Sequence, residues 1–295
     1  MPRLTKLKIF QYVAPKIVKF FKSKGSNIYS RSDMECLLHK NKSLWMLPVT
    51  TTFNEFVSFL INKNILQEVK IKLPQRIVVK YVYGNISDYE IALSMNKNSY
   101  CSHYTAMLLH NLTDNIPKNI YTNTEQTKKS VPANRSELEQ DNIDKAFSRP
   151  MRTTNQVAQI EGKKIYLLNG KNVSNIGVTD FLLDDRILKV TNIERTLIDI
   201  TVRPNYAGGI QEILNAYIAA KGRCSVNKLI SVLKKMDYTY PYHQAIGFYL
   251  ERAGYSEIVL NLVKKIEIKH NFYLTYQIKE KDFSEKWKLF FPKGF

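Results

Sequence analysis

The spacing of apolar residues changes once within the first 83 positions, and this change restricts the fold of the N-terminal part. Apolar residues recur at helical spacing at 10–21 and 53–61, and between these stretches cap residues at 29–33 precede a short helix through 36–38. Two runs of β-type composition follow, at 65–71 and 77–83, and a short connection joins them. The sequence therefore predicts three helices followed by a hairpin.

Three helices followed by a basic hairpin is the order of a winged helix-turn-helix, whose third helix enters the DNA major groove. Residues near the start of that helix would then face base edges, and basic residues around it would neutralise phosphates. The predicted base contacts are Thr51, Thr52, Asn54 and Ser58. The predicted phosphate contacts are Lys70, Lys72 and Arg76 on the hairpin, with Arg31, Lys40 and Lys42 near the second helix. The same kind of unit also serves as a protein-docking module, with its lysines merely solvated.

Positive charge is concentrated in this N-terminal part. The chain has 44 Lys and Arg against 26 Asp and Glu, a net charge of +18. Residues 1–83 carry a net +11, and the other 212 residues carry the remaining +7. A protein that is simply rich in lysine would also be basic, but its charge would not be concentrated in residues 1–83. We therefore predict a polyanion-binding domain at 1–83 and a second domain at 84–295.

The cysteine positions and the hydropathy of the chain indicate the cellular compartment. Cys36, Cys101 and Cys224 form no C-x-x-C pair, so neither a disulfide framework nor a cysteine-built zinc site is expected. Lysines between positions 16 and 24 interrupt the apolar residues near the N-terminus, and no stretch approaches the roughly 20 apolar residues of a membrane span. We expect a cytoplasmic protein that does not enter a membrane.

The larger domain mixes helical and β-type patterns, so the expected fold class is α+β: a winged helix-turn-helix followed by a mixed α/β domain with a helical half. The helical half begins at about residue 191, and the composition of 125–156 indicates a polar insertion. Within that insertion, Ser136 and the residues after it resemble a capping box for a short helix that ends near Phe147. The other predicted elements are helices at 87–95 and 99–112, strands at 119–124, 181–190 and 272–278, a hairpin at 156–168 that turns at 161–162, and a basic aromatic tail at 286–291.

No motif for catalysis or for a cofactor is evident in the sequence. His103 and His110 are seven positions apart and could share a helix face, but carboxylates at ligand spacing are missing nearby. The middle third has no Gly-rich phosphate loop, nucleophile elbow or H-E-x-x-H. We therefore expect structural histidines, no metal, no cofactor and no enzymatic activity.

The segment 190–199 is the most distinctive in the chain. Thr191 as N-cap and Glu194 three residues later fit a capping box, and Arg195 and Asp199 fit an i, i+4 ion pair. The dipeptide 203–204, Arg-Pro, should end this helix. The same acidic and basic residues could form a catalytic cluster, but capping and pairing already account for all of them.

Several blocks of the sequence resemble the AbiEi antitoxins of bacterial type IV toxin–antitoxin (abortive infection) systems. The resemblance covers most of the chain, and its most specific block is Glu-Arg-Thr-Leu-Ile-Asp at 194–199. The other blocks are the Val-Thr at 190–191, Arg-Pro at 203–204, Gly-Gly at 208–209, Ser-His-Tyr-Thr-Ala at 102–106, Leu-Thr-Asp-x-Ile-Pro at 112–117, and the N-terminal module.

This resemblance implies a cytoplasmic repressor whose winged helix binds inverted repeats in the double-stranded promoter DNA of its own operon. It also implies that the C-terminal domain counters a cognate AbiEii-like toxin, a nucleotidyltransferase-like protein, with or without direct contact. The alternative is an ordinary winged-helix transcriptional regulator with a ligand-sensing or dimerising C-terminal domain. A neighbouring gene for a nucleotidyltransferase-like protein would separate the two hypotheses.

Overall fold

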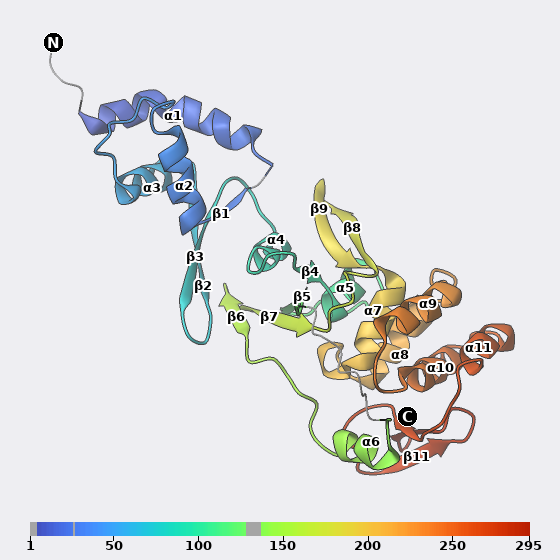
Figure 1. Cartoon of the computed structure of the whole chain (residues 1–295). Helices are drawn as coiled ribbons and strands as arrows, with labels where there is room; N and C mark the ends of the chain where they lie inside the picture. Colours follow the sequence, from blue (N-terminus) through green and yellow to red (C-terminus); the bar gives the residue numbers. More distant parts are fainter. Residues whose placement is uncertain (1–4, 26, 128–136) are drawn as a thin grey trace. The chain divides into compact units, whose positions relative to one another are not determined.

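The chain divides into two compact units, each containing helices and strands, so the expected mixed α+β class is confirmed (Figure 1). The computed structural model describes residues 5–25, 27–127 and 137–295. Unit 1 comprises Met1–Ser94 and Ala158–Gly162, and unit 2 comprises Met95–Val157 and Lys163–Phe295. Within the described ranges, no helix has both the length and the hydropathy needed to cross a bilayer.

Unit 1 contains the three predicted helices and the predicted hairpin, together with one strand that the sequence pattern did not reveal. Its elements are α1 (Lys6–Ser23), β1 (Ile28–Ser30), α2 (Arg31–Asn41), α3 (Phe53–Asn62), β2 (Gln67–Lys72), β3 (Ile77–Val82) and α4 (Asp88–Leu93). Strand β3 pairs antiparallel with both β1 and β2. Figure 1 shows β2 and β3 extending as a hairpin away from α1, α2 and α3. Strand β6 (Val157–Ile160) adds one antiparallel pair, Lys72 with Gln159.

The core of unit 1 follows from the helical spacing of its apolar residues. Helix α1 buries Phe10, Val13, Ile17 and Phe21, which recur every three or four positions. Between α2 and α3, Trp45 is 2% exposed and stacks on Phe56 with ring centroids 5.6 Å apart; Phe56 itself is fully buried. Burial of each such side chain contributes about 1.5–3 kcal/mol, so this core fixes the position of α3 against α1.

Unit 2 begins with a mixed sheet in the order β7-β5-β4-β9-β8. The helices and strands of this first half of unit 2 are β4 (Tyr100–Cys101), α5 (His103–Leu109), β5 (Asn119–Glu125), α6 (Gln140–Phe147), β7 (Lys163–Gly170), β8 (Val178–Leu183) and β9 (Arg186–Thr191). Strand β5 pairs parallel with β7 and antiparallel with β4, and β4 pairs parallel with β9. Strands β8 and β9 form an antiparallel pair, as the pattern at 181–190 predicts.

The second half of unit 2 is helical, as predicted, and closes with a small sheet. Its elements are α7 (Ile193–Val202), a 3-10 turn (Pro204–Tyr206), α8 (Ile210–Ala219), α9 (Val226–Met236), α10 (Tyr242–Arg252), α11 (Glu257–Lys264), β10 (Phe272–Tyr273), β11 (Lys281–Ser284) and β12 (Leu289–Pro292). The small sheet has the order β10-β12-β11. Trp287 is fully buried beside α10, where a Cβ added to Gly247 would lie 2.2 Å from its ring. Residues 286–291 are therefore part of the fold rather than a tail.

Three predicted elements differ from the structure. The helix expected at 99–112 begins only at His103, because Tyr100 and Cys101 pair with β5 and β9 instead. Sheet pairing there overrides the local helical pattern. The strand expected at 272–278 stops at Tyr273. The helix expected to begin near Ser136 begins at Gln140 and ends at Phe147 as predicted, but Ser136 itself lies outside the described residues.

Candidate nucleic-acid interface

The exposed side of α3 carries most of the predicted base-contacting residues. Thr52 is the N-cap: its hydroxyl accepts from the Glu55 amide at 3.3 Å, and its own amide donates to Glu55 Oε2 at 2.9 Å. Asn54 and Ser58 are exposed and four residues apart, so they lie on the same face of the helix. Thr52, Asn54 and Ser58 therefore form a small, polar, accessible surface at the start of α3.

Thr51 does not belong to this surface. Its side chain is buried, with the residue 4% exposed, so its hydroxyl is out of reach of a base edge. The periodicity could not reveal this, because Thr51 precedes the helix and its burial depends on the loop between α2 and α3. The prediction that Thr51 contacts a base is therefore withdrawn.

Three of the predicted phosphate contacts already have partners within unit 1. Lys42 Nζ donates to the carbonyl oxygens of Val49 and Thr51, at 2.9 and 2.8 Å, and so fixes the loop that leads into α3. Arg31 pairs with Glu35 at 2.9 Å and lies 4.7 Å from the centroid of the Phe53 ring. Lys70 pairs with Glu68 at 3.1 Å. Exposed pairs of this kind contribute about 0–1 kcal/mol, so the Arg31 and Lys70 pairs can exchange for a phosphate, whereas Lys42 has a positioning role.

The tip of the β2–β3 hairpin carries basic residues on both sides. The Leu73 amide donates to the Arg76 carbonyl at 2.8 Å and closes the turn, which places Lys72 and Arg76 at its two ends. Both side chains are exposed, as is Lys40 near the end of α2. In the part of the chain that the structure describes, none of these three side chains has an ion-pair partner.

Contacts distant in sequence adjust the charge of this surface. Glu55, the acidic residue on the first turn of α3, pairs with Lys6 of α1 at 2.8 Å. The hydrogen bond from Lys6 is the main cause that lowers the pKa of Glu55 to about 2, so its carboxylate is ionised and paired at neutral pH. Lys80 is half-buried and donates to the Ser94 carbonyl at 2.8 Å, so its charge is held inside unit 1. Lys6 and Glu55 are 49 positions apart, and Lys80 and Ser94 are 14 positions apart, so sequence spacing gave no signal for either contact.

In unit 2, the predicted capping box of the 190–199 segment is wrong. The N-cap of α7 is Asn192, whose Oδ1 accepts from the Arg195 amide at 2.9 Å. Thr191 ends β9, and its hydroxyl lies 2.9 Å from that of Thr196. Glu194 instead turns toward α9, where it accepts from the Ser225 amide at 3.1 Å and pairs with Lys228 at 3.0 Å. A local pattern could not distinguish Thr191 from Asn192, because both are cap formers.

The predicted Arg195–Asp199 ion pair is confirmed, and it is buried. The Nε–Oδ1 distance is 2.8 Å, and the two residues are 3% and 4% exposed. Arg195 also donates to the Ile176 carbonyl at 2.8 Å and to the Tyr100 hydroxyl at 3.3 Å. The pair thus joins α7 to β4 and to the segment before β8, which supports the structural interpretation of these residues.

The two histidines of the predicted shared face have separate structural partners. His103 Nδ1 lies 2.8 Å from the Ser102 hydroxyl, and burial lowers the pKa of His103 well below its ordinary value. His110 follows α5 and donates from Nε2 to the Thr191 carbonyl at 2.6 Å. Among the described residues, no group of three or more His, Cys, Asp or Glu side chains is placed to hold a metal ion.

Comparison with known proteins identifies a shared fold. The chain is similar to the crystal structure of the Rv2827c protein from Mycobacterium tuberculosis, with a TM-score of 0.60 over 95% of this chain and 91% of that chain. The two sequences are 14% identical, so the similarity concerns the fold alone. No family model and no curated protein matches the sequence.

Proposed function

We propose that unit 1 is a winged helix-turn-helix that binds duplex DNA, with α3 in the major groove and the β2–β3 hairpin as the wing. The order α1-β1-α2-α3-β2-β3, with β1 paired to β3, supports this proposal. The observation that carries it is the pairing of an accessible polar start of α3 with a hairpin tip bearing Lys72 and Arg76. Base edges and phosphates are the groups that such side chains recognise.

The charge of unit 1 agrees with this proposal. Residues 1–83 carry +11, and adding Asp88, Glu90 and Glu161, which belong to the same unit, leaves +8. A net positive unit attracts a polyanion at long range, whereas a protein-docking module has no need for it. The proposed DNA contacts are Thr52, Asn54 and Ser58 for bases, and Lys40, Lys70, Lys72, Arg31 and Arg76 for phosphates.

For the whole chain, we propose an antitoxin that represses its own operon and counters a nucleotidyltransferase-like toxin through unit 2. The basis is the resemblance to AbiEi antitoxins in the blocks at 102–117 and 190–209. The most specific of these blocks, residues 194–199, contains the buried Arg195–Asp199 pair, whose role in the fold accounts for those two residues. The alternative is an ordinary regulator in which unit 2 senses a ligand or dimerises, and a cavity in unit 2 gives that alternative a physical basis.

DNA binding is tested with the full-length chain and a duplex from its own upstream region. Lys72→Ala with Arg76→Ala should weaken binding to every duplex and reduce the slope of log K against log salt by about 0.9 for each phosphate that is no longer neutralised. Lys16→Ala with Lys19→Ala removes the same charge from the exposed face of α1 and serves as the matched control. Equal reductions in affinity for the two double variants would contradict the proposed wing.

Base reading by α3 is tested separately. Asn54→Ala should reduce the preference for the upstream duplex over a scrambled one by about 1–3 kcal/mol if Asn54 contacts a base. Binding that does not depend on salt would remove the DNA proposal altogether.

The antitoxin role is tested by co-expression with a nucleotidyltransferase-like protein, should a neighbouring gene encode one. The Lys72→Ala, Arg76→Ala variant should lose promoter repression and still restore growth, because the proposal assigns the two tasks to different units. If the intact chain represses the promoter but gives no protection, the ordinary regulator is the better description.

A further inference from the structure

Unit 2 contains a cavity of about 580 Å³ at the end of α6, the end of α7 and the loop from α9 to α10. Small-molecule sites in proteins have volumes of about 300–1,000 Å³, so the cavity has the size of a ligand pocket. All its lining residues belong to unit 2 and to the described part of the chain. No motif in the sequence pointed to it, because its walls come from segments that are distant in the chain.

The charge of this cavity is positive and is not balanced by its own lining. Three arginines, Arg149, Arg152 and Arg203, contribute side chains to the wall, and no Asp, Glu or His does. Within the described residues, no carboxylate lies at ion-pair distance from any of the three guanidinium groups. A guanidinium presents paired N–H donors that match the oxygens of phosphate, so three of them around one cavity favour a ligand with several negative charges.

Tyrosines form the rest of the polar wall. Tyr238, Tyr240, Tyr242 and Tyr276 line the cavity, and Tyr242 and Tyr276 are close enough for each to affect the pKa of the other. Aromatic side chains provide flat surfaces on which a nucleobase can stack, and such stacking does not depend on the identity of the base. The combination of cationic and aromatic groups therefore fits a ligand that has both phosphates and a planar ring.

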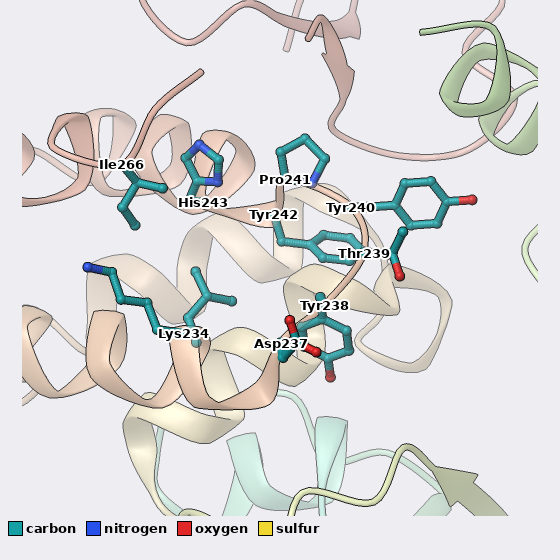
Figure 2. A pocket seen from close by; sticks show the side chains of 10 residues that line it. Lys234, Asp237, Tyr238, Thr239, Tyr240, Pro241, Tyr242, His243 and Ile266 are labelled. Atoms are coloured by element: carbon teal, nitrogen blue, oxygen red, sulfur yellow. The ribbon is translucent and has the colours of Figure 1, made fainter. Parts of the chain in front are cut away.

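The same tyrosine loop also borders a smaller cavity of about 250 Å³. Figure 2 shows this second cavity, with Lys234 and Ile266 on one side and Thr239 and Tyr240 on the other. Residues 238–240 and Tyr242 line both cavities, so the loop is the wall between them. Movement of an aromatic ring in this loop would change the volumes of both cavities.

Helix α7 fixes one side of the larger cavity. Arg203 is the C-cap of α7, and its amide donates to the Asp199 carbonyl at 3.0 Å. The Asp199 carboxylate is held in the core by Arg195, and its charge acts on both Arg203 and Tyr238. The buried Asp199 charge thus acts electrostatically on one cationic and one aromatic group of the cavity wall.

We propose that this cavity binds a nucleoside phosphate, with Arg149, Arg152 and Arg203 on the phosphates and Tyr240 against the base. The site belongs to unit 2, whereas the proposed DNA-binding surface belongs to unit 1, and nucleotide binding there would favour the ligand-sensing alternative for unit 2. A single inorganic phosphate would leave most of the volume empty, and an uncharged apolar ligand would make no use of the three guanidinium groups.

The test is isothermal titration calorimetry of the full-length chain with the four ribonucleoside triphosphates, the four nucleosides and inorganic triphosphate. At least one nucleoside triphosphate should bind at least tenfold more tightly than inorganic triphosphate and than its own nucleoside. Arg203→Gln and Tyr240→Ala should each weaken it tenfold or more. Because Arg152 is exposed, Arg152→Gln provides a second cationic variant whose folding does not depend on the core.

Two controls separate this site from general attraction to a basic protein. Lys145→Gln removes one charge from the exposed face of α6, beside the cavity but not in its lining, and should change affinity less than twofold. Lys72→Ala with Arg76→Ala should weaken DNA binding and leave nucleotide binding unchanged. Absence of binding at 1 mM for all four triphosphates, equal binding of inorganic triphosphate, or an equal reduction with Lys145→Gln would each overturn the proposal.

Discussion

The buried Arg195–Asp199 pair offers a quantitative test of the forces that hold unit 2 together. Asp199→Leu removes the carboxylate and leaves the Arg195 guanidinium, which is 3% exposed, without its counter-charge. Breaking a buried pair in this way costs about 3–5 kcal/mol. We expect the lower end, because Arg195 keeps its hydrogen bonds to the Ile176 carbonyl and the Tyr100 hydroxyl.

The double variant Arg195→Met, Asp199→Leu should be more stable than Asp199→Leu alone. It removes both charges, and the remaining cost, about 1–3 kcal/mol, comes from the Ile176 carbonyl, which loses its donor, since the Tyr100 hydroxyl still accepts from Asn123 Nδ2 at 2.6 Å. The two substitutions are therefore non-additive, and the double variant should cost less than the sum of Asp199→Leu and Arg195→Met made singly.

The assay is urea unfolding followed by tryptophan fluorescence in a Trp45→Phe background. Trp45 lies in unit 1 and Trp287 in unit 2, so this background reports unit 2 alone and avoids treating two units as one transition. A destabilisation below about 1 kcal/mol for Asp199→Leu, or a double variant whose cost equals the sum of the single ones, would refute the argument that this pair is fully desolvated.

Two further predictions concern α7 and α10. Asn192→Ala should lower the free energy of unfolding by about 0.5–2 kcal/mol, because it removes the N-cap of α7. Thr191→Ser keeps the hydroxyl beside Thr196 and should cost less. Urea unfolding midpoints in the reverse order would contradict the assigned cap. Burial lowers the pKa of His243 to about 4 from an unfolded value near 6.5, so the unfolded chain binds more protons and stability falls as pH drops from 6.5 toward 4. His243 should therefore lower the free energy of unfolding by about 2 kcal/mol between pH 7 and pH 5. A folded His243→Leu variant that is destabilised as much as the parent over this range would exclude this assignment.

The sequence by itself determined most elements whose signal is local. Helical spacing of apolar residues predicted α1 and α3 because a helix that packs on a core must repeat its buried face every three to four residues. The end of α7 was predicted from the Arg-Pro at 203–204, because a proline cannot continue a helix. Of the candidate DNA contacts, Thr52, Asn54 and Ser58 are exposed as expected, since their position on α3 follows from the same period.

Only the tertiary structure decided which of these residues are accessible and what they contact. Thr51 is buried and Glu55 is paired with Lys6 because a loop and a distant helix pack there, and no spacing rule encodes either contact. Tyr100 and Cys101 form a strand because β5 and β9 offer backbone partners, which outweigh the helical pattern around them. The arginine and tyrosine cavity was invisible for the same physical reason: its charge is assembled from segments that are distant in the chain and adjacent only after folding.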